Sequence, residues 1–390
     1  MRVAGYHTGV MGTGEHARQL TAALRTQQIE IEAITLHGTD ALEDEALAPG
    51  TGAVATDRFA DINLLSVNAD STAHTAEQLG PAFFAGRYTI GFWAWEVSTF
   101  PTRWNEATRW LDEIWVGSRH VRDAIAPVVD RPVRVIPQPV SLAPSAAEAA
   151  PPAGLPGGHR FLFAYDYLSV FARKNPLAVI DAFSRAFAPG AGASLIVKTL
   201  NHDRVPEAHE RLRTAAAAHP DVHLFEQRLA ASERDGLMGA ADCYVSLHRA
   251  EGFGYTMAEA MWLGKPVIGT GYSGNMDFMS PRNSFPVDYR LVPIGPGAEP
   301  YPPDGTWAEP DVAQAARLMR GIVEDPAGAA RRGARAAQDI RASHGPEAAG
   351  RAMAARLQEI LTEPAYADRR RSGSAGRRLL NRLRGRQGPG

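Results

Sequence analysis

Two glutamates, Glu251 and Glu259, are the first and last residues of the segment EGFGYTMAE. The glycines of this segment and the helix start that follows them suit the binding of an anionic ligand. Gly252 and Gly254 lie between the two glutamates, and glycines let a backbone approach a ligand closely with its amide N–H groups exposed. These amides precede a helix that we expect from residue 257 to 263. The start of a helix favours an anion, because its first amides are unpaired and the helix dipole is positive there.

Purely structural interpretations of the same residues stay open. Thr256 and Glu259 have the spacing of a capping box, in which the glutamate only closes the start of the helix. Gly252 and Gly254 also suit a tight turn.

Two cations, Arg173 and Lys174, form a second candidate group. They stand before Asn175 and Pro176, which are a good N-cap and a good first residue for a helix over 177–187. Cations beside the positive end of a helix cost roughly 0.3–1 kcal/mol each at an exposed site. A bound diphosphate would supply the compensating charge, with arginine as a fork and lysine as a point charge. The alternative is a solvated pair at a loop tip.

The first half of the chain has candidates of its own. A loop containing Gly12 and Gly14 follows the first expected strand and opens a helix over 15–25. Trp95 and Glu96 end a later strand. Aromatic faces stack on sugar rings and carboxylates accept hydrogen bonds from hydroxyls, so this strand end is a candidate sugar-binding site. Ordinary aromatic packing is the alternative.

Five more residues receive an interpretation. Asn68 and Asp70, at the end of the third strand, are further candidates for binding hydroxyl groups. Lys198 ends another strand, at the same edge of the expected sheet as Lys174. It is interpreted either as a further phosphate contact or as a strand-end lysine that extends its ammonium group to solvent. His16 is interpreted as a helix-surface histidine and His120 as a cap-region histidine.

The elements that position these residues follow an alternating β/α pattern, which is typical of parallel sheets. The expected strands lie near residues 3–6, 30–34, 63–67, 89–95, 113–116, 133–136, 161–165, 195–198, 222–225, 244–247 and 267–269. The further expected helices are near 207–218, 233–240, 311–323 and 346–361. Ligands bind at the carboxyl ends of such strands, so two doubly wound domains predict a cleft between them.

Composition narrows the class of protein. The chain has 390 residues, 45% of them hydrophobic, a formal net charge of −2 and one cysteine, Cys243. No intramolecular disulfide can form, and no apolar run approaches the ~18 residues of a membrane span. Eight arginines and one aspartate fall within 366–390, which leaves an acidic body and argues against binding of nucleic acid. We find no metal-ligand spacing among histidine, aspartate and glutamate.

The sequence resembles the retaining GT-B glycosyltransferases of family four, whose mark is E-G-F-G-x-x-x-x-E. The resemblance extends over the amino-terminal glycine loop, RKNP, ADCYVSLHRAEGFG and GKPVIGTGYSGNMDF. It implies an α/β GT-B fold with two Rossmann-like domains and an interdomain cleft. The expected parts are an acceptor-side domain 1–140, a linker 141–159, a nucleotide-sugar domain 160–345, a helix 346–365 and a disordered basic tail 366–390.

The resemblance also assigns roles by position. Glu251 would bind donor-sugar hydroxyls, Glu259 the ribose, and Lys174 the diphosphate, with Arg173 as second cation by our own inference. The remaining expected donor contacts are Gly252, Phe253, Gly254, Gly12, Gly14 and Lys198; the acceptor-side residues are Glu96, Trp95, Asn68 and Asp70.

These features predict transfer of a hexose-type sugar from a nucleoside diphosphate sugar to a hydroxyl acceptor, which would be a saccharide, a lipid-linked saccharide or a small molecule. We expect retention, no cofactor and no metal. A sugar-nucleotide epimerase and a non-catalytic nucleotide-sugar-binding subunit are the alternatives. We expect a cytoplasmic location, and peripheral membrane contact through the basic tail is the alternative to a solvated tail.

Overall fold

The computed structural model describes residues 1–38, 43–50, 58–142 and 149–371. The chain divides into two compact units. The first unit contains Met1–Trp95, Phe100–Pro139 and His344–Gly390, and the second contains Glu96–Thr99 and Val140–Ser343. The sequence therefore crosses between the units more than once.

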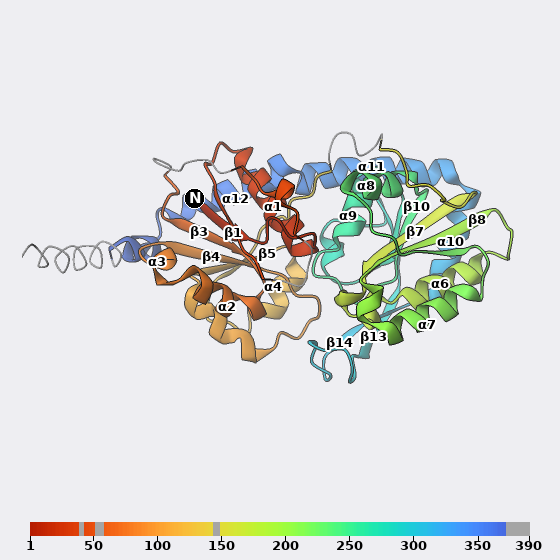
Figure 1. Ribbon diagram of the computed structural model, residues 1–390, viewed down its shortest axis with the longest axis horizontal. Coiled ribbons are helices and arrows are strands. Elements are labelled where there is room, and N and C mark those ends of the chain that lie inside the picture. The colour runs from red at the N-terminus through yellow and green to blue at the C-terminus, as the bar shows by residue number, and fades with distance from the viewer. Residues whose placement is uncertain (39–42, 51–57, 143–148, 372–390) are drawn as a thin grey trace, which may run out of the picture. The chain divides into compact units, whose positions relative to one another are not determined.

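The first unit is a six-stranded parallel sheet in the order β2-β1-β3-β4-β5-β6, with helices against it (Figure 1). Its strands are β1 (Arg2–Gly5), β2 (Glu32–Thr35), β3 (Ile62–Ser66), β4 (Tyr88–Trp93), β5 (Glu113–Val116) and β6 (Val133–Val135). Its helices are α1 (Gly12–Arg25), α2 (Ala69–Leu79), α3 (Pro81–Phe84), α4 (Arg119–Ile125) and α12 (Pro346–Ile360), with 3-10 turns Glu45–Leu47 and Thr102–Trp110. β3 and β4 are buried at every position, as expected for central strands of a covered parallel sheet.

The second unit repeats this architecture with a parallel sheet in the order β12-β11-β10-β7-β8-β9. Its strands are β7 (His159–Asp166), β8 (Ala193–Leu200), β9 (Val222–Phe225), β10 (Cys243–Ser246), β11 (Val267–Thr270) and β12 (Phe285–Val287). Its helices are α5 (Phe171–Lys174), α6 (Pro176–Ala186), α7 (Pro206–Ala217), α8 (Ala231–Ala240), α9 (Tyr255–Trp262), α10 (Val312–Glu324) and α11 (Pro326–His344), with 3-10 turns Tyr167–Ser169, His202–Arg204 and Gly274–Asp277. An antiparallel hairpin of β13 (Tyr289–Pro293) and β14 (Thr306–Pro310) completes it.

The predicted α/β class with two doubly wound parallel sheets is confirmed, and all eleven expected strands form within a few residues of their predicted ends. Helix α11, strand β12 and the β13–β14 hairpin are among the features that were not predicted. The α11 sequence is rich in alanine and arginine and has little apolar periodicity, so no helical stripe announces it.

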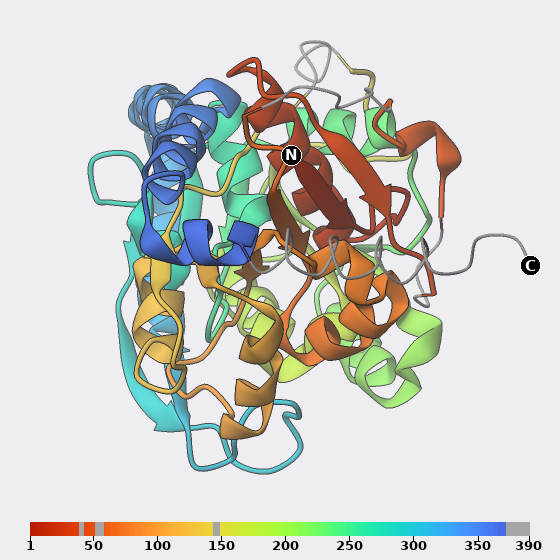
Figure 2. The same cartoon turned by 90° about the vertical axis from the view of Figure 1, so that its left-hand side faces the viewer.

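The last helix, α12, packs on α1 of the first unit (Figure 1 and Figure 2). Its Met353, Leu357 and Ile360 belong to a core cluster that also contains Leu20 and Leu24. The chain thus returns to the unit in which it began.

The expectation of a disordered tail from residue 366 is wrong for its first residues. Residues 364–371 are helical, and the Tyr366 side chain is buried in the same core cluster as α12. Arg369 and Arg370 pair with Asp112 and Asp61 of the first unit. Local carboxylates therefore neutralise the start of the basic segment, and the rest of the expected tail, 372–390, lies outside the described residues.

Candidate functional site

The two predicted cations lie where the short helix α5 meets α6. Arg173 and Lys174 are the last residues of α5, and Asn175 adopts a left-handed conformation with φ 55° before α6 begins. Asn175 is the N-cap residue of α6 and Pro176 its first residue, as predicted, but the Asn175 side chain makes no capping hydrogen bond. Its amide donates to the carbonyl of Leu247 at 3.0 Å instead. That hydrogen bond ties the junction of the two helices to the segment that follows β10.

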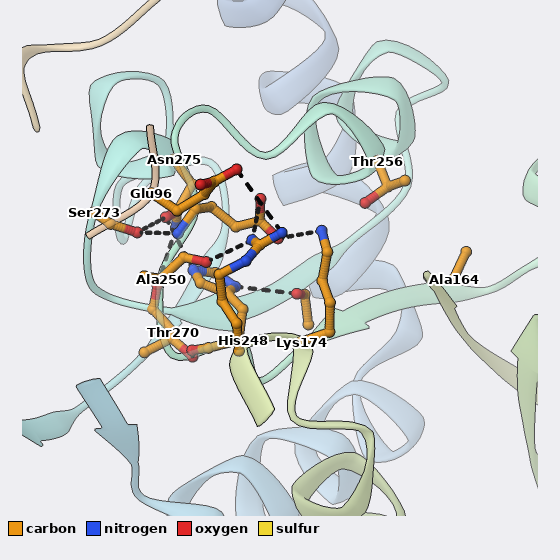
Figure 3. A network of polar contacts seen from close by, with 12 residues as sticks. Glu96, Ala164, Lys174, His248, Ala250, Thr256, Thr270, Ser273 and Asn275 are labelled. Atoms are coloured by element: carbon orange, nitrogen blue, oxygen red, sulfur yellow. Dashed lines mark hydrogen bonds and ion pairs between the residues drawn. The ribbon is translucent and has the colours of Figure 1, made fainter. Parts of the chain in front are cut away.

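Glu251 forms ion pairs with both cations, in the polar network around Lys174 and Glu96 that Figure 3 shows. Its Oε1 lies 2.5 Å from Lys174 Nζ, and its Oε2 lies 3.2 Å from Arg173 Nη1, which also donates to the carbonyl of Ala250 at 2.9 Å. Only 5% of the Arg173 side chain and 10% of the Glu251 side chain are exposed. The interpretation of the cations as a solvated pair at a loop tip is therefore wrong. The structure brings Lys174 into direct contact with Glu251, which the sequence analysis assigned to the same donor site, and the roles of both residues stay predictions.

The electrostatics of this cluster keep Glu251 ionised. Burial acts to raise the pKa of Glu251, but the charges of Lys174 and Arg173 outweigh it and lower that pKa to about 2. Burial lowers the pKa of Lys174, and the attraction of Glu251 opposes this shift. An ionised carboxylate only accepts hydrogen bonds, so Glu251 is suited to bind hydroxyl groups.

Hydrogen bonds from the 270s segment hold the backbone around Glu251. The Glu251 amide pairs with Ser273 Oγ at 2.8 Å, and the Gly274 amide donates to the Glu251 carbonyl at 2.8 Å. Asn275 links this segment to His248, since its Oδ1 lies 3.1 Å from His248 Nε2. Burial lowers the pKa of His248, which favours the neutral ring in this hydrogen-bond chain.

Gly274 has no room for a side chain. A Cβ at this position would lie 1.9 Å from the carbonyl oxygen of Gly252. We expect Gly274→Ala to displace the Glu251–Gly254 loop and to lower the free energy of unfolding by about 1–3 kcal/mol. The measurement is denaturant unfolding beside Gly321→Ala, where a Cβ meets nothing within 4 Å. Equal stability of the two variants would contradict this account of the loop.

Helix α9 starts two residues too early for the predicted capping box. Its N-cap is Gly254, at φ 96°, and Thr256 lies inside the helix, where its Oγ1 accepts a hydrogen bond from the Tyr244 hydroxyl at 2.7 Å. The capping-box interpretation of Glu259 is therefore wrong. Glu259 is half-buried on α9, and its expected contact with a ribose stays a prediction.

Glu96 has an unexpected position. It was predicted on the acceptor side, yet the segment Glu96–Thr99 groups with the second unit. Glu96 Oε1 lies 3.9 Å from Arg173 Nη2, and Glu96 Oε2 accepts a hydrogen bond of 2.9 Å from the Tyr301 hydroxyl. Arg173 thus lies between the carboxylates of Glu96 and Glu251.

Other acceptor-side candidates lie in the first unit. Trp95 is 4% exposed and packs edge-to-face on Phe100 and Trp104, which is the aromatic-packing alternative rather than a free stacking face. Asn68 Oδ1 accepts a hydrogen bond from the Ala94 amide at 3.1 Å. Asp70 is exposed in the first turn of α2.

The amino-terminal glycine loop is closely packed. A Cβ on Gly14 would lie 2.2 Å from the Gly9 carbonyl oxygen, whereas one on Gly12 would meet nothing within 4 Å. Arg18 Nη1 donates to the carbonyls of His7 and Gly9 at 2.7 and 3.0 Å and so fixes the loop. Gly14 therefore has a packing role, and the donor contacts expected of Gly12 and Gly14 stay predictions.

Of the two histidine interpretations, the structure contradicts the one for His16 and agrees with the one for His120. His16 is not a helix-surface residue: its ring packs edge-to-face on Phe92 at 4.4 Å between centroids, and burial lowers its pKa to about 3. His120 is the second residue of α4, close to the Ser118 cap as predicted.

Lys198 has polar partners of its own within the second unit. It lies within β8 rather than at its end, and its Nζ donates to the Thr199 carbonyl at 2.6 Å. Burial lowers its pKa to about 8, against the attraction of Glu226 and Asp166. The predicted phosphate contact stays a prediction.

Metal-binding clusters and membrane-spanning helices are both absent from the described ranges. Within them, no group of three or more histidine, cysteine, aspartate or glutamate residues is arranged to hold a metal ion. No helix in the described part of the chain has the length and apolar character that a membrane crossing requires.

Sequence reasoning missed several residues of the site. Tyr301 lies just before the β14 strand, far along the chain from its partner Glu96, and no motif marked it. Ser273 and Asn275 belong to the GTGYSGN run, whose small and polar residues follow an expected strand and are the available signal.

Comparisons with known proteins agree with this architecture. Residues 118–353 match a family model described as "Family 4 Glycosyltransferase in conflict systems". No match is found among curated proteins. HepE of Anabaena, solved with UDP and glucose, is 15% identical with a TM-score of 0.62 over 92% of this chain and 99% of its own.

Two further solved structures have similar folds. Sucrose-phosphate synthase of Thermosynechococcus elongatus is 15% identical with a TM-score of 0.63, over 92% of this chain and 98% of its own. A glycosyltransferase of Rickettsia africae is also 15% identical, with a TM-score of 0.61 over 93% of this chain and 98% of its own.

Proposed function

Because the chain belongs to the family described as "Family 4 Glycosyltransferase in conflict systems", we propose that it moves a hexose-type sugar from a nucleoside diphosphate sugar to a hydroxyl acceptor, with retention and without a metal ion. The observation that carries the proposal is the buried cluster of Lys174, Arg173 and Glu251. It combines two cations for a diphosphate with an ionised carboxylate for sugar hydroxyls.

The cations act on the leaving group. As the bond between the anomeric carbon and the phosphate oxygen breaks, negative charge builds on the diphosphate. Lys174 and Arg173 are already fixed by burial and by Glu251, so little reorganisation is needed to stabilise that charge. Fixed donors that meet developing charge lower the barrier more than they stabilise the bound substrate.

Retention requires the acceptor to attack from the face that the diphosphate leaves. The acceptor oxygen bonds to the anomeric carbon, and its proton passes to the departing phosphate oxygen. The phosphate thus acts as the base, and the protein supplies no covalent nucleophile. Glu251 binds the sugar hydroxyls in this scheme, and Glu259 is assigned the ribose of the nucleotide.

The charge of the two cations supports metal independence. A nucleoside diphosphate bound without Mg²⁺ needs positive charge from the protein. Lys174 and Arg173 are adjacent and supply this charge. We therefore expect a chelator to leave the transfer rate unchanged.

UDP-sugars are the first donors to test. HepE, which shares the fold, has been solved in complex with UDP-glucose and with UDP and glucose. We propose the same nucleotide for this chain and a saccharide as the acceptor class.

The experiment incubates the protein with a panel of UDP-, GDP-, ADP- and dTDP-sugars, with and without saccharide acceptors and EDTA. Free nucleoside diphosphate and the anomeric configuration of the product are measured. We expect acceptor-dependent release that EDTA does not change, and a product of retained configuration. Conversion of the donor sugar without an acceptor would instead identify an epimerase, and binding without turnover a non-catalytic subunit.

A further inference from the structure

Arg173 is the most constrained charged group of the site. Its Nη1 faces Glu251 and its Nη2 faces Glu96, while 4% of the residue is exposed. Its Nε–H is buried and donates to no acceptor within the described residues. Side-chain contacts, rather than solvent, therefore set the direction of the guanidinium.

The two carboxylates hold Arg173 unequally. Glu251 is at 3.2 Å and also contacts Lys174, so it is bound to both cations. Glu96 is at 3.9 Å, beyond an ordinary hydrogen bond, and its other oxygen is held at 2.9 Å by the Tyr301 hydroxyl. The two oxygens of Glu96 therefore face different partners, Arg173 and Tyr301.

The charges of the cluster balance. Arg173 and Lys174 carry two positive charges, and Glu96 and Glu251 carry two negative charges. An incoming diphosphate meets a site whose cations are already paired, and it has to compete with a carboxylate for Arg173. Of the two carboxylates, Glu96 makes the longer and weaker contact.

We infer that Glu96 and Tyr301 are positioning residues for Arg173: Glu96 aims the guanidinium and competes with the diphosphate for it, and the Tyr301 hydroxyl holds Glu96 back so that the diphosphate can enter. The inference rests on the proposed function. It assigns a role to the β13–β14 hairpin region, which contributes Tyr301 to a site otherwise built from parallel-sheet loops.

The two positions predict opposite changes in binding. Glu96→Gln keeps an acceptor for Tyr301 but removes the competing charge, so diphosphate binding should become about tenfold tighter, while kcat falls because Arg173 is less firmly aimed. Tyr301→Phe keeps the ring but frees Glu96 to pair more closely with Arg173. Diphosphate binding should then become weaker by about threefold.

The test measures inorganic pyrophosphate and UDP by calorimetry, and kcat and KM with the donor found active. Glu324→Gln on α10 and Tyr289→Phe on β13 make the same chemical changes outside the cluster and should match the wild type. A merely structural role would weaken binding in both cluster variants.

The outcomes separate the two proposals. If the wild type binds and the Glu96→Gln and Tyr301→Phe variants shift in opposite directions, the inference stands. If the wild type binds but the two variants are unchanged or weakened alike, this inference is wrong and the proposed function is untouched. A wild type that binds neither pyrophosphate nor any nucleoside diphosphate overturns both.

Discussion

Lys174→Ala should lower kcat for sugar transfer by about 10³-fold, the range seen when one fixed donor to a developing oxyanion is removed. Lys174 Nζ lies 2.5 Å from Glu251, and only 16% of the lysine side chain is exposed. The variant removes a positioned charge that water reaches poorly. Of its two cationic partners, Glu251 keeps only Arg173 in this variant, so we expect the pKa of Glu251 to rise.

The measurement is steady-state kinetics with the donor and acceptor found active, with folding checked by thermal unfolding. Lys265→Ala is the matched control, because it removes the same charge after α9, where Lys265 Nζ donates to the Gly239 carbonyl. Lys174→Arg tests geometry, since it keeps the charge and changes the shape of the donor. A folded Lys174→Ala variant that retains wild-type turnover would remove the basis of the proposed function.

The contact between Lys174 and Glu251 could be predicted from the sequence because local rules determine most of it. Each residue follows a strand of one parallel sheet, β7 for the lysine and β10 for the glutamate, and these strands are adjacent. Loops at the carboxyl ends of adjacent parallel strands lie together. Strand periodicity and the flanking glycines are therefore enough to bring Lys174 near Glu251.

The partners of Arg173 could not be predicted in this way. Glu96 follows β4 of the first sheet and Tyr301 precedes β14, so their hydrogen bond joins segments that no local periodicity relates. The partner of the Asn175 side chain could not be predicted for a similar reason. Local pattern places Asn175 at the N-cap of α6, but its side chain donates to the Leu247 carbonyl, a tertiary partner, and its backbone is left-handed.

The ion pair that joins α12 to β5, between Arg356 and Glu113, could not be predicted from the sequence either. Glu113 stands in the run EIWV, where a charged residue suggests the exposed end of a strand, yet it is fully buried. Its partner Arg356 comes from the other end of the sequence. A buried charge is stable only when it is paired, and the sequence does not reveal which cation pairs with it.

Glu113→Ala should therefore cause the largest loss of stability, about 3–5 kcal/mol in the free energy of unfolding of the first unit, because it leaves a buried arginine without its main partner. Glu113 Oε1 accepts from Arg356 Nε at 2.9 Å and from Trp115 Nε1 at 2.6 Å, and Glu113 Oε2 pairs with Arg356 Nη2. Tyr88 donates a further hydrogen bond of 3.3 Å to the same carboxylate.

Denaturant unfolding followed by tryptophan fluorescence measures this loss, because Trp115 contacts the altered carboxylate. Glu77→Ala on the exposed face of α2 is the control and should stay within about 0.5 kcal/mol of the wild type. The double variant Glu113→Gln with Arg356→Met removes both charges and should recover much of the stability, since no buried charge is then left alone. Equal losses in Glu113→Ala and in the double variant would contradict this account and mean that the hydrogen bonds between Glu113 and Arg356, rather than the avoidance of an unpaired charge, hold α12 on the first unit.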